Sequence, residues 1–113
     1  ALSVLLISLN AFAQKLTHRW TSDTLLRVPE SVLHDTKNKI LYVANINGKS
    51  DQKDGNGFIS RLTMDGKIET LKWVEGLDAP KGMALVKNLL YVADVTSVAI
   101  IDITTGKITK RLE

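Results

Sequence analysis

Short apolar segments separated by polar turns run along the chain from about residue 29 to its end. They fall into two groups of four segments, each of strand length. The segments are 30–34, 39–46, 58–64 and 67–74 in the first group, and 82–86, 89–95, 98–103 and 107–112 in the second. Turn signals such as Asp65-Gly66 and Thr105-Gly106 separate them, and no stretch after residue 13 has the 3.6-residue apolar period of a helix. The pattern predicts an all-β chain.

The two groups also repeat one another residue by residue. Tyr42-Val43-Ala44 returns as Tyr91-Val92-Ala93, a spacing of 49 residues, and Gly66-Lys67-Ile68 returns as Gly106-Lys107-Ile108, a spacing of 40. The difference falls in the loop 47–57, which is longer than its counterpart in the second group. A period of about 40–50 residues built from four short strands is typical of a β-propeller blade. The sequence therefore predicts about two four-stranded antiparallel blades.

The first 13 residues have the pattern of a secretory signal peptide. Residues 2–9 form an apolar run, and Ala11-Phe12-Ala13 fits the small-x-small cleavage rule. A short membrane anchor or buried helix is the alternative, but the run is much shorter than the roughly 20 residues that span a bilayer. We therefore expect a periplasmic or secreted protein that has no membrane contact after cleavage.

These patterns divide the chain into four predicted parts. They are a signal peptide at 1–13, a lead-in strand at 14–28, blade 1 at 29–77 and blade 2, truncated in its last strand, at 78–113. Two blades cannot close a ring, since propellers have about 4–8. We expect an N-terminal fragment of a longer propeller. A complete chain that assembles into a ring of copies is the weaker alternative, because neither end looks natural.

Two segments of blade 1 carry a family likeness. Pro29–Asp35 reads PESVLHD, and Asn38–Ile46 reads NKILYVANI. Together they resemble the start of the SMP-30/gluconolactonase/LRE-like family of six-bladed propellers, and Asp78-Ala79-Pro80 is similar to that family's link into its second blade. Val32 replaces the family's Pro, and His34 stands where Trp is usual. Blade 2 is equally similar to NHL-type repeats.

The resemblance implies a metal site and an activity. In that family one divalent metal lies at the top of the central channel, held by a Glu from the first blade and by Asn, Asn and Asp from later blades. Glu30 matches the Glu, so the resemblance implies that Glu30 is a ligand of Ca²⁺ or Zn²⁺. Such an ion polarises a carbonyl and activates water, and the activity implied is hydrolysis of a sugar lactone or related ester. Alternatively, Glu30 is a solvated or backbone-capping acid.

The sequence is also compatible with a second function. Because blade 2 matches generic repeats, the protein could be a non-catalytic NHL-like propeller that binds a protein, peptide or glycan. Its partner would then be a peptide or glycan ligand rather than a small-molecule substrate. Propeller folds host many functions, so fold alone does not decide.

Charge and rare residue types narrow these options. The net charge is +3, and the basic residues are scattered among acids, which excludes a nucleic-acid interface. There is no cysteine, so disulfides and thiolate chemistry are excluded. The two histidines, His18 and His34, lack zinc-site spacing. We expect His34 to pack in the family's Trp position; the alternative is that it lines the channel beside Glu30. We expect Trp20 and Trp73 to belong to the core.

Two polar features allow a structural and a functional interpretation. Asn45 and Asp94 follow the two Tyr-Val-Ala triplets at equivalent places. A polar residue repeated in each blade is expected to bond turn backbone rather than to form a site. The loop 47–57 is either a flexible hairpin insertion or a lid that contacts substrate.

Overall fold

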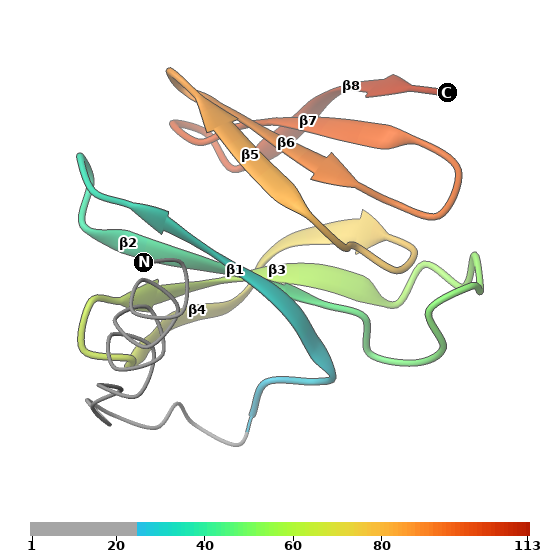
Figure 1. Cartoon of the computed structure of the whole chain (residues 1–113), viewed down its shortest axis with the longest axis horizontal. Coiled ribbons are helices and arrows are strands. Elements are labelled where there is room, and N and C mark those ends of the chain that lie inside the picture. The colour runs from blue at the N-terminus through green and yellow to red at the C-terminus, as the bar shows by residue number, and fades with distance from the viewer. Residues whose placement is uncertain (1–24) are drawn as a thin grey trace, which may run out of the picture.

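The computed structural model describes residues 25–113, which form two four-stranded antiparallel sheets (Figure 1). The predicted signal peptide and most of the predicted lead-in strand therefore lie outside the described residues. The first sheet contains β1 (Pro29–Asp35), β2 (Ile40–Asn45), β3 (Gly57–Thr63) and β4 (Ile68–Leu77). The second sheet contains β5 (Met83–Val86), β6 (Leu89–Ala93), β7 (Val98–Asp102) and β8 (Lys107–Leu112). No helix occurs among residues 25–113, which confirms the all-β prediction.

Each sheet is a meander in which neighbouring strands follow one another along the chain. The turns that join them use local side-chain bonds and left-handed backbone. The Asp35 carboxylate accepts hydrogen bonds from Asn38, at 3.1 Å from its backbone N and 2.8 Å from its Nδ2. Gly66 and Gly106 have φ of 88° and 69°, a region in which glycine has no steric penalty. These turn signals are readable in the sequence, and each of the eight strands predicted from residue 29 onward is present. No helix in this part of the chain is long and apolar enough to cross a membrane.

β4 departs from the strict two-residue alternation that is typical of a strand. Its pairing with β3 shifts register at three places. Such irregularities rotate the strand, so that residues adjacent in sequence can point to one side. Trp73 and Val74 accordingly both contact the same core cluster, whereas the alternation had placed them on opposite faces.

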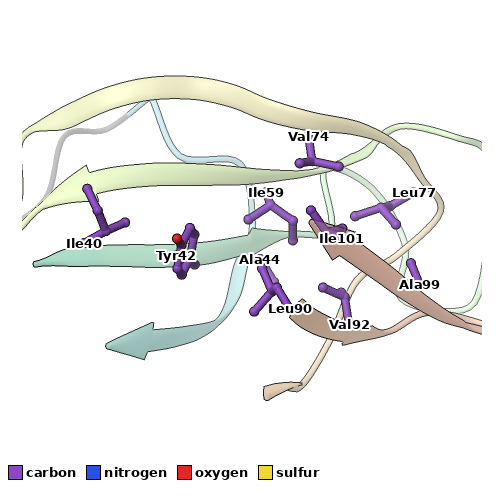
Figure 2. Packing of buried hydrophobic residues seen from close by; sticks show 10 residues of the cluster. All are labelled: Ile40, Tyr42, Ala44, Ile59, Val74, Leu77, Leu90, Val92, Ala99 and Ile101. Carbon is purple, nitrogen blue, oxygen red and sulfur yellow. The ribbon is translucent and has the colours of Figure 1, made fainter. Parts of the chain in front are cut away.

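The two sheets pack face to face over one apolar core. Figure 2 shows side chains from both sheets in this cluster. Its buried members are Ile40, Tyr42, Ala44, Ile59, Val74, Leu77, Leu90, Val92, Ala99 and Ile101. The closest backbone approach between the sheets is between their first strands, β1 and β5. The sheets are therefore joined at β1 and β5, and the core side chains fill the space between their other strands.

Candidate functional site

Glu30, the predicted metal ligand, is the second residue of β1. It lies at the end of the first sheet where β2 ends and β3 begins, because Pro29 pairs with Asn45. We call this region the Glu30 end; it comprises the start of β1, the loop 46–56, the link 78–82 and the turn 94–97. The Glu30 side chain is exposed. Ser31, the next residue, is half-buried and donates its hydroxyl to the Lys81 carbonyl at 2.5 Å. Glu30 lies at a register shift between Pro29 and Ser31 and has no partner residue on β2.

The loop 46–56 is tied to the link between the sheets at two places. The Lys81 ammonium donates to the Ser50 carbonyl at 2.8 Å, and the Gly55 backbone N–H donates to Asp78 Oδ1 at 3.0 Å. Both contacts are exposed. The loop therefore lies over the link at the Glu30 end, in contact with residues that lead into β5.

Asp94 is a buried structural acid, as its repeated position predicts. Its carboxylate accepts backbone hydrogen bonds from Asp78 at 2.9 Å, Ala79 at 2.7 Å and Val95 at 2.9 Å. Arg111 Nη1 lies 3.9 Å from Asp94 Oδ2 and adds a longer ionic contact. The carboxylate thus holds the link in place before β5, and each of its two oxygens already accepts at least one backbone hydrogen bond.

Asn45 has the equivalent structural role in the first sheet. Its Oδ1 accepts from the Arg27 backbone N–H at 2.8 Å, and its Nδ2 donates to Ser60 Oγ at 3.0 Å. In both sheets, the polar residue at the end of the second strand fixes the backbone just before the first strand. The structural interpretation of Asn45 and Asp94 is confirmed.

The acids of the described region do not converge on a metal position. Among residues 25–113, no three His, Asp or Glu side chains gather closely enough to hold an ion. Glu30 forms no ion pair within this region, so its carboxylate is available, but a metal there would need ligands from outside these residues. His34 is also exposed. The prediction that His34 packs like the family's Trp is therefore wrong, whereas Trp73 contacts the core as predicted.

Sequence analysis missed a polar network at the opposite end of the first sheet. Tyr42, only 1% exposed, hydrogen-bonds through its hydroxyl to Asp35. The ring of Trp73 lies 5.1 Å from the Tyr42 ring and 5.4 Å from the Arg61 guanidinium carbon, centroid distances that permit aromatic and cation–π contact. Arg61 Nη2 is 3.4 Å from Glu69 Oε1. One signal was available: two-residue alternation from Ile59 places Arg61 on the core-facing side of β3.

The network perturbs two acid–base groups. Burial by itself would raise the pKa of Asp35, but hydrogen bonds from Asn38, Lys37 and Tyr42 outweigh it and lower the pKa below its usual value. Burial raises the pKa of Tyr42, and the neighbouring Asp35 charge raises it further. Asp35 is therefore ionised and Tyr42 protonated at neutral pH.

Comparison with known proteins gave no match: no family model, no curated protein and no solved structure matches the chain.

Proposed function

We propose that the two sheets are consecutive blades of a β-propeller. Three features support this assignment. Both sheets are four-stranded meanders, they stack face to face on one core, and their first strands lie closest together. In a propeller, four-stranded blades surround a central channel, and each packs against its neighbours. β1 and β5 would then be the strands that line the channel.

On this assignment, the protein is a metal-dependent hydrolase of a sugar lactone or related ester, similar to the SMP-30/gluconolactonase/LRE-like family. The observation that carries the proposal is the position of Glu30: an exposed carboxylate at the start of β1, within the segment that resembles the family's ligand segment. The signal-peptide pattern of residues 1–13 favours a secreted or periplasmic enzyme.

The chemistry follows from the ligand type. A carboxylate oxygen is a hard donor that suits Ca²⁺ and is also accepted by Zn²⁺. A bound divalent ion polarises a lactone carbonyl and lowers the pKa of an attacking water. Glu30 would contribute one ligand at the channel mouth, and the loop 46–56, which lies at the same end, would contact the substrate.

Metal titration of the full-length protein tests the proposal. We expect calorimetry with Ca²⁺ and Zn²⁺ to detect binding of one ion to the wild type, and we expect Glu30→Gln to lose it. Glu75→Gln is the matched control, because Glu75 is an exposed acid of β4. A wild type that binds neither ion, or a Glu30→Gln variant that binds normally, would contradict the assignment. The first result would favour the non-catalytic propeller that binds a protein, peptide or glycan.

A further inference from the structure

A polar pocket opens at the end of the molecule opposite Glu30. It has a volume of about 320 Å³, near the lower end of the range of about 300–1,000 Å³ that ligand pockets occupy. Its lining residues are Asn38, Tyr42, Arg61, Asn88, Ile103 and Thr104. They come from the β1–β2 turn, β2, β3, the β5–β6 turn and the β7–β8 turn, so both sheets contribute to one pocket.

The lining offers hydrogen-bonding groups of several kinds. Asn38 uses its Nδ2 to donate to Asp35 Oδ2, and this leaves the amide oxygen as an acceptor. Asn88 and Thr104 are exposed at the rim, with an amide and a hydroxyl that can each donate and accept. A ligand with several hydroxyl groups would match this mixture, because each hydroxyl also donates and accepts.

Arg61 is the one cation that lines the pocket, and the protein provides acceptors for only some of the hydrogen-bond donors of its guanidinium. Its contact with Glu69 is long, at 3.4 Å. Its Nε is buried and has no acceptor, and it is the only such buried side-chain atom found among residues 25–113. A buried donor without an acceptor is costly. The Nε atom itself is closed to solvent, so an oxygen atom from the pocket side would bond the guanidinium through its Nη groups and add to the long contact with Glu69.

The charge around the pocket decides the ligand class. Three charged groups act on Tyr42, which lines the pocket: Asp35, Arg61 and Glu69. Arg61 and Glu69 lie 3.4 Å apart. One positive and two negative groups leave no net attraction for an anion. Four lysines lie in or next to the adjoining turns, but they are exposed, and salt screens exposed charges at distances beyond about 8–10 Å. They are Lys37, Lys39, Lys87 and Lys107.

We propose that this pocket binds a neutral, polyhydroxylated molecule of monosaccharide size. Arg61 donates to a ligand oxygen, and Asn38, Asn88 and Thr104 exchange hydrogen bonds with its hydroxyl groups. The pocket is separated from Glu30 by the length of β2. The site is therefore distinct from the proposed metal centre and does not depend on it.

NMR titration of the full ¹⁵N-labelled chain tests the proposal, with the methyl glycosides of glucose, galactose and mannose as probes. The readouts are the Arg61 Nε–H, the Trp73 indole N–H and the backbone amides of Asn38, Asn88 and Thr104. We expect at least one glycoside to shift these signals saturably. Arg61→Lys should weaken binding at least about tenfold, because the lysine ammonium lacks the planar, fixed set of N–H donors of the guanidinium.

Control variants and charged probes make the test decisive. Asn88→Ala changes an exposed rim residue and should weaken binding even if Arg61→Lys disturbs the fold. Asn56→Ala, an amide at the Glu30 end, and Glu30→Gln should leave binding unchanged. Glucuronate should bind more weakly than the glucoside. Tighter binding of glucuronate, shifts confined to the Glu30 end, or no shift with any glycoside would overturn the proposal.

Discussion

At the scale of single residues, the ionisation of Asp35 makes the stability of the fold depend on pH. Its folded pKa is lowered by hydrogen bonds that prevail over burial, so the ionised form stabilises the folded state above the unfolded pKa of about 3.9. This stabilisation should be lost as the pH falls through the lower, folded pKa. We expect urea unfolding of Asp35→Asn to show a shallower decline in stability below about pH 4 than the wild type. Asp51→Asn, at an exposed loop position, is the control and should keep the wild-type acid limb.

Tyr42 should act at the opposite end of the pH scale. Burial and the charge of Asp35 raise its pKa above that of the unfolded chain, which is about 10. Its stabilisation is therefore fully present below about pH 10 and is lost as the pH rises through the folded pKa. Tyr42→Phe should be less stable at pH 7, because Asp35 loses a donor, and should show a weaker alkaline decline. Tyr91→Phe removes a hydroxyl from the second sheet, and an identical loss of the alkaline limb there would contradict this role of Tyr42.

Asp94 shows how strongly one buried carboxylate can stabilise the link between the two sheets. Asp94→Ala would remove the acceptor of three backbone N–H groups in and beside the link between the sheets. We expect a loss of about 2–4 kcal/mol in the free energy of unfolding, because buried donors without partners are costly. Asp54→Ala is the control, since Asp54 accepts one exposed backbone bond from Asn56 and should cost less than about 1 kcal/mol. Equal losses in the two variants would contradict the proposed role.

At the scale of elements, the strands were predictable because their signals are local. Asp35 bonding Asn38, and glycines with positive φ at the β3–β4 and β7–β8 turns, are visible as turn residues in the sequence. The register shifts that bring Trp73 and Val74 to one side of the sheet could not be predicted, because they depend on how β4 pairs with β3. Local chemistry therefore determines where strands begin and end, whereas pairing determines which side chains meet.

The contrast between local signals and long-range packing also explains which parts of the candidate sites could be predicted. Glu30 was found from a contiguous segment, and its exposed position at the start of β1 agrees with that placement; its role as a ligand stays a prediction. The pocket could not be predicted, since Asn38, Arg61, Asn88 and Thr104 lie on four separate parts of the chain. Only the packing of one sheet on the other brings them together.

The link between the sheets gives a prediction about one backbone position. A Cβ at Gly57, the first residue of β3, would lie 2.3 Å from Pro80 Cδ and 2.7 Å from the Asp78 carbonyl oxygen. These neighbours belong to the backbone and a rigid ring, so they cannot move aside cheaply. We expect Gly57→Ala to lower the free energy of unfolding by about 1–3 kcal/mol. Gly82→Ala has no atom within 4 Å of the added carbon; a loss there as large as at Gly57 would show that the clash is not the cause.

At the scale of the whole molecule, the two sheets share one core and should unfold together. Each sheet has its own continuous hydrogen-bonded meander, but residues of β2, β3 and β4 contact residues of β6 and β7 in a single buried cluster. Without the other sheet, the apolar face of each meander would be exposed to water, which is unfavourable. Each sheet therefore depends on the other for the cover of its apolar face.

Leu90 tests this dependence, because it belongs to β6 and is fully buried in the shared cluster. Leu90→Ala should lower the free energy of unfolding by about 2–5 kcal/mol, the cost of a cavity in a packed core. If the sheets are one cooperative unit, native-state hydrogen exchange should accelerate equally for core amides of β2 and of β6, although the change lies in the second sheet only. Leu112→Ala removes a side chain that is 43% exposed and should change neither set by more than about 0.5 kcal/mol. Faster exchange in β6 with unchanged protection in β2 would mean that the first sheet is stable without its neighbour. The shared core would then be a contact surface between two independently stable sheets.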